Sequence, residues 1–305
     1  MTSDPTYTFA VIDVTVLGAI YEQFIAKRIE IGSRRRVTLN DKPEVRVSGG
    51  VFVTPRKVVD TIVDRTLGPL CNVKSPEEVA SLKIVDIACG SGTFLLSAFA
   101  FLQSWHLGWY INDGVEEHNG KEIYEVGGGN WKLTLAEKRR ILLNNIFGVD
   151  IDDQAVEVTQ FGLLLRAIED EDEGSVRAYR RRTKQRALPS LDGNIKCGNS
   201  LVDIASLRQF IPNPSEELLV SINPFNWKSE FHEVVEQGGF DVIVGNPPYI
   251  RIQRMVRYAP EEAEFYQSDL SGYASAQRDN FDKYQLFVER AISLLREGGC
   301  LGYMR

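Results

Sequence analysis

The sequence is poor in the residues that build metal centres and disulfides. Among 305 residues it has four cysteines and three histidines. The cysteines stand far apart and show neither zinc-ligand spacing nor a disulfide framework; they are Cys71, Cys89, Cys197 and Cys300. We therefore expect no metal ion and a reducing, cytoplasmic environment.

Long apolar runs and an excess of positive charge are also missing. No run reaches the roughly 20 residues of a membrane-spanning helix, and we expect no signal peptide from the residues at the start of the sequence. The net charge is −7, so a broad basic surface for phosphate is not expected. The composition, 43% hydrophobic and 25% charged, is typical of a soluble chain with one substantial core.

One segment with clear local order is a strand followed by a glycine turn and a helix. Residues 82–85 have strand character, Asp86 to Phe94 contains Gly90 and Gly92, and an apolar helical run follows. Such a turn brings backbone close to a ligand and presents free N–H groups at a helix start. The spacing is not that of dinucleotide-binding enzymes.

Two further strands are predicted to end in polar residues. Residues 145–152 indicate a strand that ends at Asp150, a carboxylate suited to ribose hydroxyls. Asp152 is equally suited to capping a helix. Residues 194–197 indicate a third strand, after which Asn199 either contacts an adenine edge or fills a turn.

The segment Asn246-Pro247-Pro248-Tyr249 follows the apolar run 240–245, which reads as a buried strand. The Asn246 side-chain oxygen and the Pro247 carbonyl can each accept one N–H of an exocyclic amine, and the two prolines hold these acceptors still. Tyr249 offers a flat face on which a planar substrate can stack. The alternative is a rigid turn after a strand.

Taken in order along the chain, these motifs resemble those of S-adenosylmethionine-dependent N6-adenine DNA methyltransferases of the gamma motif order. Among these the chain looks most similar to the type IIG-like methylases of restriction-modification and phage-defence systems. The matching stretches are 50–55, 86–94, 133–152, 198–201 and 240–249, with the segments 225–227, 231–234 and 238–241 also typical. The resemblance implies an α/β, Rossmann-like class I methyltransferase: a mostly parallel sheet flanked by helices, with an N-terminal helical extension.

The resemblance also implies a role for each matching residue. The catalytic residues would be Asn246, Pro247, Pro248 and Tyr249. S-adenosylmethionine would be bound by Thr54, Pro55, Asp86, Ala88, Gly90, Gly92, Thr93, Phe94, Asp150, Ile151, Asn199, Ser200 and Leu201. The chain departs from the family at Asn199, where Asp is frequent, at Ile87, where Pro is common, and at residues 52–53, where Tyr-Tyr is frequent.

The implied reaction methylates an adenine that has been flipped out of double-stranded DNA. Catalysis would come from positioning and from fixed hydrogen-bond acceptors, without a metal or a general base. Backbone phosphates would meet either Arg180, Arg181 and Arg182 or, closer to the catalytic loop, Arg251 and Arg254. The basic run at 177–186 is also consistent with a solvated helix.

The expected organisation is an N-terminal helical extension at 1–48, with helical spacing over 10–31, and a catalytic domain at 49–305. A long insertion at about 104–140 includes Gly127–Gly129 in a surface loop, and residues 251–280 read as a mobile flap. A helix at 281–295 leads to a strand from Cys300. The last strands of the family's sheet and its target-recognition domain are expected in cis or in another chain.

Two other functions remain open from the sequence. A protein-glutamine or RNA-adenine methyltransferase would use the same four-residue motif, because an amide nitrogen has the same delocalised lone pair. The second alternative is a fragment that binds the cofactor but is inactive without its C-terminal part.

Overall fold

The computed structural model describes the backbone of Lys27–Ile31 and Val37–Asp41 and then residues 54–169, 171, 173–184, 186–277 and 280–304. The first two segments form an antiparallel hairpin, β1 and β2. The predicted helix over 10–31 is therefore wrong for its last five residues, and the rest of it lies outside the described residues. The reason is visible in the sequence: Ile29 and Ile31 alternate with charged residues, which is the period of a strand.

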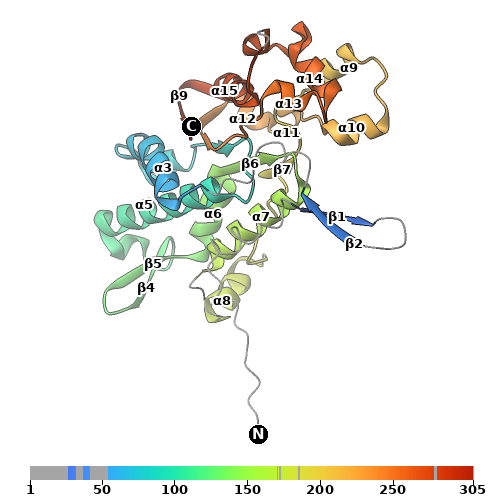
Figure 1. Cartoon of the computed structure of the whole chain (residues 1–305). Helices are drawn as coiled ribbons and strands as arrows, with labels where there is room; N and C mark the ends of the chain where they lie inside the picture. Colours follow the sequence, from blue (N-terminus) through green and yellow to red (C-terminus); the bar gives the residue numbers. More distant parts are fainter. Residues whose placement is uncertain are drawn as a thin grey trace.

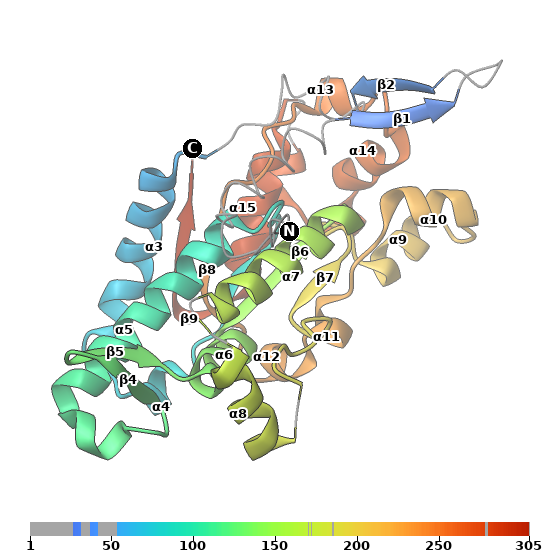
Figure 2. The same ribbon diagram turned by 90° about the horizontal axis from the view of Figure 1, so that it is seen from below.

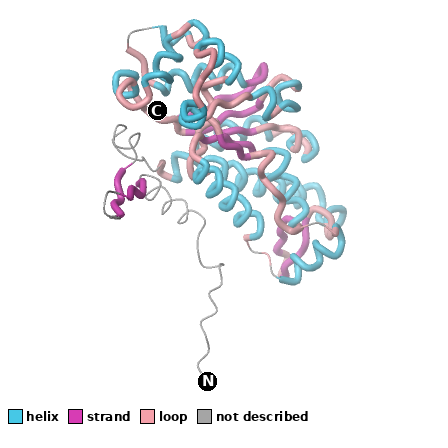
Figure 3. The backbone as a smooth tube through the Cα atoms, turned by 90° about the vertical axis from the view of Figure 1, so that its right-hand side faces the viewer, coloured by secondary structure: helices cyan, strands magenta, loops and turns pink. Residues whose placement is uncertain are grey.

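A five-stranded parallel sheet organises the rest of the chain (Figure 1). Its spatial order is β7-β6-β3-β8-β9, with every neighbouring pair parallel. The strands are β3 (Ile84–Asp86), β6 (Ile146–Asp150), β7 (Ile195–Cys197), β8 (Phe240–Gly245) and β9 (Leu295–Tyr303). β3 and β8 are apolar along almost their whole length because helices cover both faces of the sheet. Figure 3 shows the strands enclosed between helices.

One face of the sheet is covered by α3 (Arg56–Cys71), α5 (Thr93–His118), α6 (Leu135–Asn145) and α7 (Asp153–Ile168). The other face has an aromatic core under α11 (Trp227–Glu230), α12 (His232–Glu236) and α15 (Lys283–Leu294). Phe147, Phe231 and Phe240 meet there in edge-to-face contacts. The α/β, Rossmann-like fold predicted from the motifs is confirmed.

Buried amides fix the amino-terminal edge of the sheet. Asn145 Nδ2 donates to the carbonyl oxygens of Val79 and Leu82, each at 2.8 Å. Asn194 Nδ2 donates in the same way to Leu143 and Ile146. These bonds tie backbone carbonyls of the connecting segments to buried side-chain amides, so they hold the connections that enter β3, β6 and β7.

The remaining elements lie outside this sheet. They are α4 (Pro76–Val79), β4 (Ile123–Gly127), β5 (Asn130–Leu133), α8 (Glu173–Thr183), α9 (Ile204–Phe210), α10 (Glu216–Ile222), α13 (Ile252–Met255), α14 (Pro260–Gln267) and two short 3-10 helices, Asp269–Ser271 and Ala274–Gln277. Residues 127–129 form the exposed turn between β4 and β5 with positive φ, which confirms the predicted surface loop.

The predicted flap over residues 251–280 is wrong as far as the structure describes that segment. Its short helices bury Ile252, Met255, Phe265, Tyr266 and Tyr273 in the aromatic core. These apolar residues are spaced for helices among many polar ones, so the segment looks polar on average although it has a buried side. The segment is a packed part of the domain.

Candidate active site

The predicted site residues meet at the carboxyl ends of the parallel strands, the edge where α/β folds bind ligands. Asp86 ends β3, Asp150 ends β6, Asn199 follows β7 and Asn246 follows β8. Thr54 lies just before α3 and contacts Asn246. The sheet order therefore brings residues nearly 200 positions apart in sequence to one edge.

The glycine turn after β3 is held in a conformation that needs glycine. Gly90 and Gly92 have backbone φ angles of 53° and 81°, values that residues other than glycine rarely adopt. A Cβ on Gly92 would lie 2.8 Å from the side chain of Thr159, whose hydroxyl donates to the Gly90 carbonyl at 2.8 Å. α5 starts directly after the turn, at Thr93.

Asp150 ties the turn to the end of β6. One carboxylate oxygen accepts from Gly90 N at 2.8 Å, and the other accepts from Asp152 N at 3.0 Å. Each oxygen keeps a further lone pair for a ligand hydroxyl. Asp152 caps α7 by accepting from Gln154 N, which confirms the capping alternative for that residue. Ile151, between the two, is 46% exposed.

Two carboxyl groups lie at this edge, Asp86 buried and Asp150 half-buried. Burial, reinforced by the nearby Asp150 charge, raises the pKa of Asp86 to about 8, although a hydrogen bond from Ala88 N works against the rise. Burial likewise raises the pKa of Asp150, while its backbone hydrogen bonds lower it. Both groups would be stabilised as carboxylates by a cation or by hydroxyl donors.

The Asn199 side chain is part of a buried polar network. Its Nδ2 donates to Glu262 Oε1 at 2.9 Å, and its Oδ1 accepts from Leu201 N at 3.1 Å. Lys283 also donates to Glu262, at 3.0 Å, as does the Tyr266 hydroxyl. Burial pushes the pKa of Glu262 up, but Lys283 and these hydrogen bonds outweigh it, so the pKa lies below its usual value.

This network fixes which way the Asn199 amide points. An ionised carboxylate can only accept hydrogen bonds, so the Asn199 NH₂ group faces Glu262. The Asn199 amide oxygen is then the atom that accepts from Leu201 N. Ser200 is tied to the same edge of the sheet, because its hydroxyl donates to the Ile87 carbonyl at 2.6 Å. Sequence reasoning missed Glu262 and Lys283. The only local signal was the spacing of Glu262 and Tyr266, which lie four residues apart.

The segment after β8 contains a buried hydrogen-bond acceptor that has no partner among the described residues. Asn246 Nδ2 donates to Thr54 Oγ1 at 3.1 Å, while Asn246 Oδ1 is buried and has no hydrogen-bond partner among the described residues. A buried carbonyl without a partner costs about 1–3 kcal/mol. Pro247 is buried and Pro248 half-buried, so the segment is held in place.

Tyr249 is a supported aromatic platform. Its ring stacks on Tyr284, with centroids 5.1 Å apart and planes 8° apart, and its hydroxyl donates to the Met304 carbonyl at 2.6 Å. The side chain is 39% exposed. An exposed aromatic ring backed by a second ring can stack on a planar ligand.

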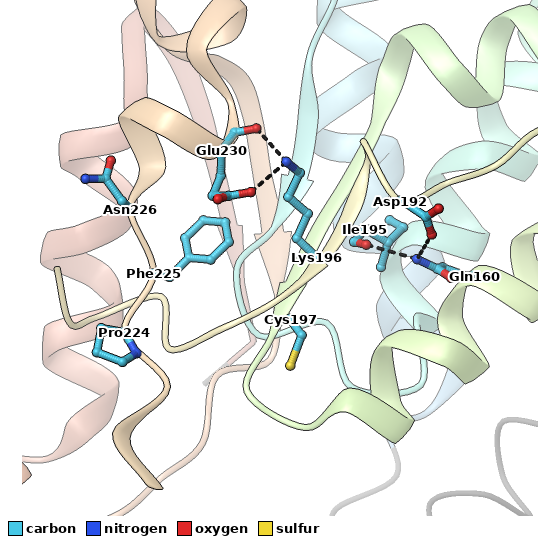
Figure 4. Close-up of a pocket in the computed structure, with 9 residues that line it drawn as sticks. All are labelled: Gln160, Asp192, Ile195, Lys196, Cys197, Pro224, Phe225, Asn226 and Glu230. Carbon is cyan, nitrogen blue, oxygen red and sulfur yellow. Dashed lines mark hydrogen bonds and ion pairs between the residues drawn. The ribbon is translucent and has the colours of Figure 1, made fainter. Parts of the chain in front are cut away.

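Two hollows lie near this edge. One, of about 330 Å³, runs along β7 and is lined by Gln160, Asp192, Ile195, Lys196, Cys197, Pro224, Phe225, Asn226 and Glu230 (Figure 4). Lys196 crosses it to Glu230 at 2.8 Å. None of the predicted catalytic or cofactor residues lines it, so we do not assign it to the candidate site.

The second hollow, of about 690 Å³, lies directly after the Asn246–Tyr249 segment. It is lined by Arg251, Gln253, Arg254, Asn280, Phe281, Asp282 and Gln285. By contrast, α8 with Arg180–Arg182 lies at the opposite end of the molecule from the tip of β9 and from α13 (Figure 2). Within the described residues no cluster of potential metal ligands is found, and no helix is long and apolar enough to cross a membrane.

A parallel sheet with a glycine turn, a terminal aspartate on the next strand and an Asn-Pro-Pro-Tyr segment defines a Rossmann-like methyltransferase. Two family models agree: N-6 DNA Methylase matches residues 13–183, and Eco57I restriction-modification methylase matches residues 144–305. The chain belongs to the family of N-6 DNA methylases of the Eco57I restriction-modification type.

Similar proteins include the type II restriction enzyme and methyltransferase RM.Eco57I of Escherichia coli, 36% identical over 98% of this chain and 27% of that protein. The adenine-specific methyltransferase PglX of Streptomyces coelicolor is 29% identical over 68% of this chain and 15% of that protein. The DrdV–DNA complex shares the fold, with a TM-score of 0.50, 16% identity and coverage of 96% of this chain and 23% of that chain. The chain thus spans about a quarter or less of these three proteins.

Proposed function

We propose that this chain is the catalytic region of a DNA-adenine N6-methyltransferase that uses S-adenosylmethionine, in a restriction-modification or phage-defence system. The observation that carries the proposal is the buried, unpartnered Oδ1 of Asn246 at the end of β8. A fixed acceptor of this kind suits an N–H donor that arrives with a substrate.

The methyl acceptor would be the exocyclic amine of a flipped adenine. Asn246 Oδ1 and the Pro247 carbonyl would each accept one of its N–H groups, which localises the lone pair on nitrogen. Stacking on Tyr249, itself backed by Tyr284, would repay part of the few kcal/mol that base flipping costs. The amine proton can leave after methyl transfer, so no general base is needed beforehand.

The residues at the strand ends fit a cationic cofactor with a ribose. Asp150 keeps free lone pairs for ribose hydroxyls, and the buried Asp86 suits a neighbouring positive charge. Thr54, Pro55 and the turn from Ala88 to Phe94 would border the amino-acid end. Asn199 to Leu201 would meet the adenine end. When bound, S-adenosylmethionine supplies the electrophilic methyl group.

Double-stranded DNA is the proposed partner, and the hollow beside the catalytic segment is the proposed contact to its backbone. Arg251 and Arg254 line this hollow together with amide side chains that suit phosphate oxygens, while the Asp282 carboxylate in the same lining caps the start of α15. Its place directly after Tyr249 would hold the strand next to the flipped base. Arg180–Arg182 are not retained for this role because α8 lies at the far end of the domain (Figure 2).

Sequence recognition would be supplied by a target-recognition region in cis or in trans. The support is the length of the relatives, since this chain corresponds to 27% of RM.Eco57I. The proposal assigns chemistry to this chain and specificity to that region.

The decisive experiment compares the full-length protein with its Asn246→Ala variant. Labelled S-adenosylmethionine and double-stranded DNA with many potential sites are the substrates, and N6-methyladenine is the product to detect. Loss of one preorganised acceptor should lower the rate about 10²- to 10³-fold. Asn130→Ala, at the exposed start of β5, is the matched control and should retain full activity.

The same assay separates the other two functions. RNA and a glutamine-containing release-factor peptide are offered in parallel, and methylation of either in place of DNA would refute the proposal. Binding of S-adenosylmethionine without any methyl transfer by the full-length protein would instead indicate a cofactor-binding fragment.

A further inference from the structure

The hydroxyl of Tyr303 is a buried polar group to which the proposed reaction assigns no role. Tyr303 is the last residue of β9 and lies opposite Gly245, the last residue of β8. Its hydroxyl oxygen is inaccessible to solvent and has no hydrogen-bond partner among the described residues. Because buried hydroxyls are normally bonded, this one is a candidate contact for a ligand.

The surroundings place this hydroxyl inside the candidate site. The Tyr303 ring lies 6.2 Å from Tyr284, the ring that supports Tyr249. Burial, and then the charge of Asp86, raises the pKa of Tyr303 well above its usual value, so the hydroxyl keeps its proton and can donate it to an acceptor. The next residue, Met304, donates its N–H to the Gly245 carbonyl at 3.1 Å, which fixes the end of β9 beside the catalytic segment.

The order of the strands places Tyr303 relative to the two proposed ligands, the cofactor and the target base. The residues proposed for the cofactor lie at the ends of β3, β6 and β7, on one side of β8. Tyr303 lies on the other side, at the end of β9, together with the Tyr249–Tyr284 stack. The Tyr303 ring is therefore on the side proposed for the target base, and the Asp86 charge that acts on its hydroxyl puts that hydroxyl at the boundary with the cofactor residues.

We propose that the Tyr303 hydroxyl donates a hydrogen bond to a ring nitrogen of the flipped adenine, either N1 or N7. Both nitrogens flank the exocyclic amine and both are acceptors, so either matches a protonated hydroxyl close to the amine acceptors of Asn246. The contact would orient the base in its plane while Tyr249 fixes the plane itself. This inference rests on the proposed function and adds a residue that recognises the base.

The test uses the full-length protein and its Tyr303→Phe variant, which keeps the ring and removes only the hydroxyl. Since no partner is lost, the melting temperature should stay the same or rise, and affinity for S-adenosylmethionine should be unchanged. Methylation of DNA, as kcat/KM, should fall about tenfold, the usual effect of one neutral hydrogen bond. Tyr124→Phe in the β4–β5 hairpin is the control for removal of a hydroxyl far from the site and should leave activity unchanged.

A second arm replaces the target adenine with 1-deazaadenine or 7-deazaadenine. The wild type should be slowed about tenfold by one of the two analogues, and Tyr303→Phe should not be slowed further by that analogue. Full activity of Tyr303→Phe would overturn the inference, as would equal sensitivity of both proteins to both analogues or a loss of cofactor affinity in the variant. If the wild type methylates no DNA at all, the proposed function itself has failed.

Discussion

The buried carboxyl of Asp86 gives the sharpest prediction, because its pKa differs greatly between the folded and unfolded chains. Burial raises the folded pKa to about 8 from a usual value of 3.8. A carboxyl with a raised folded pKa binds its proton more tightly in the native state. Its contribution to stability is therefore fully present below pH 4 and is lost progressively as pH rises to about 8.

The magnitude follows from the size of the shift. Each pKa unit corresponds to about 1.36 kcal/mol, so a shift of about four units amounts to roughly 5 kcal/mol between pH 4 and pH 8. Asp86→Asn removes the titrating group, and its side-chain oxygen can still accept from Ala88 N. Without cofactor, the variant should gain stability relative to wild type as pH rises across this window.

The assay is urea unfolding of both proteins at pH 5, 6, 7 and 8. Asp64→Asn, an exposed substitution on α3, is the control for removing a surface charge. The difference in unfolding free energy between Asp86→Asn and wild type should increase with pH at roughly 1 kcal/mol per unit. A difference that does not change with pH would refute the reasoning.

The same carboxyl should link cofactor binding to proton release. With a folded pKa near 8, Asp86 is mostly protonated at pH 7, and a cationic ligand beside it would favour the carboxylate. Calorimetric titration with S-adenosylmethionine in buffers of different ionisation enthalpy should show release of close to one proton at pH 7. Asp86→Asn should release none, and equal release by both proteins would contradict this role.

Three further predictions concern stability and can be measured by chemical denaturation. Asn145→Ala removes two buried hydrogen bonds, although the Val79 carbonyl keeps its bond from Leu82 N, and should cost about 2–3 kcal/mol. Gly245→Ala would put a methyl group 2.6 Å from the buried carboxylate of β3 and should cost about 1–3 kcal/mol, whereas Gly68→Ala on α3 has open space and should cost nothing. Glu262→Ala leaves the ammonium of Lys283 uncompensated and should cost about 3–5 kcal/mol, part of which Lys283→Met should restore in the double variant. No change in any of these would contradict the packing described.

The individual motifs could be predicted because each is local in the sequence. The glycine turn after β3 and the prolines after β8 follow short apolar runs, and such residues fix backbone angles whatever surrounds them. Individual strands, the helix after the glycine turn and the position of Asp150 at a strand end are predicted from such patterns, whereas the parallel sheet flanked by helices follows from the family resemblance. The assignment of these residues to a cofactor and a base stays a proposal.

The elements that were predicted wrongly depend on average composition or on a competing period. The helical spacing over 10–31 predicts the end of a helix at residues 27–31, but isoleucine alternates there with charge and these residues pair with Val37–Asp41. The polar average composition of residues 251–280 predicts a flap. Only packing against the aromatic core reveals that Phe265 and Tyr266 are buried.

The sequence by itself determined the pieces of the site: a strand that ends in Asp86, a turn that requires Gly92, and a rigid acceptor at Asn246. The tertiary structure decided their neighbours. The order of the parallel strands brought Tyr303 beside Gly245, where its hydroxyl has no partner among the described residues, and the packing of α14 joined Asn199 to Glu262. Local patterns specify backbone conformation within a few residues, whereas contacts between distant strand ends exist only once the sheet has assembled and buried both of its faces.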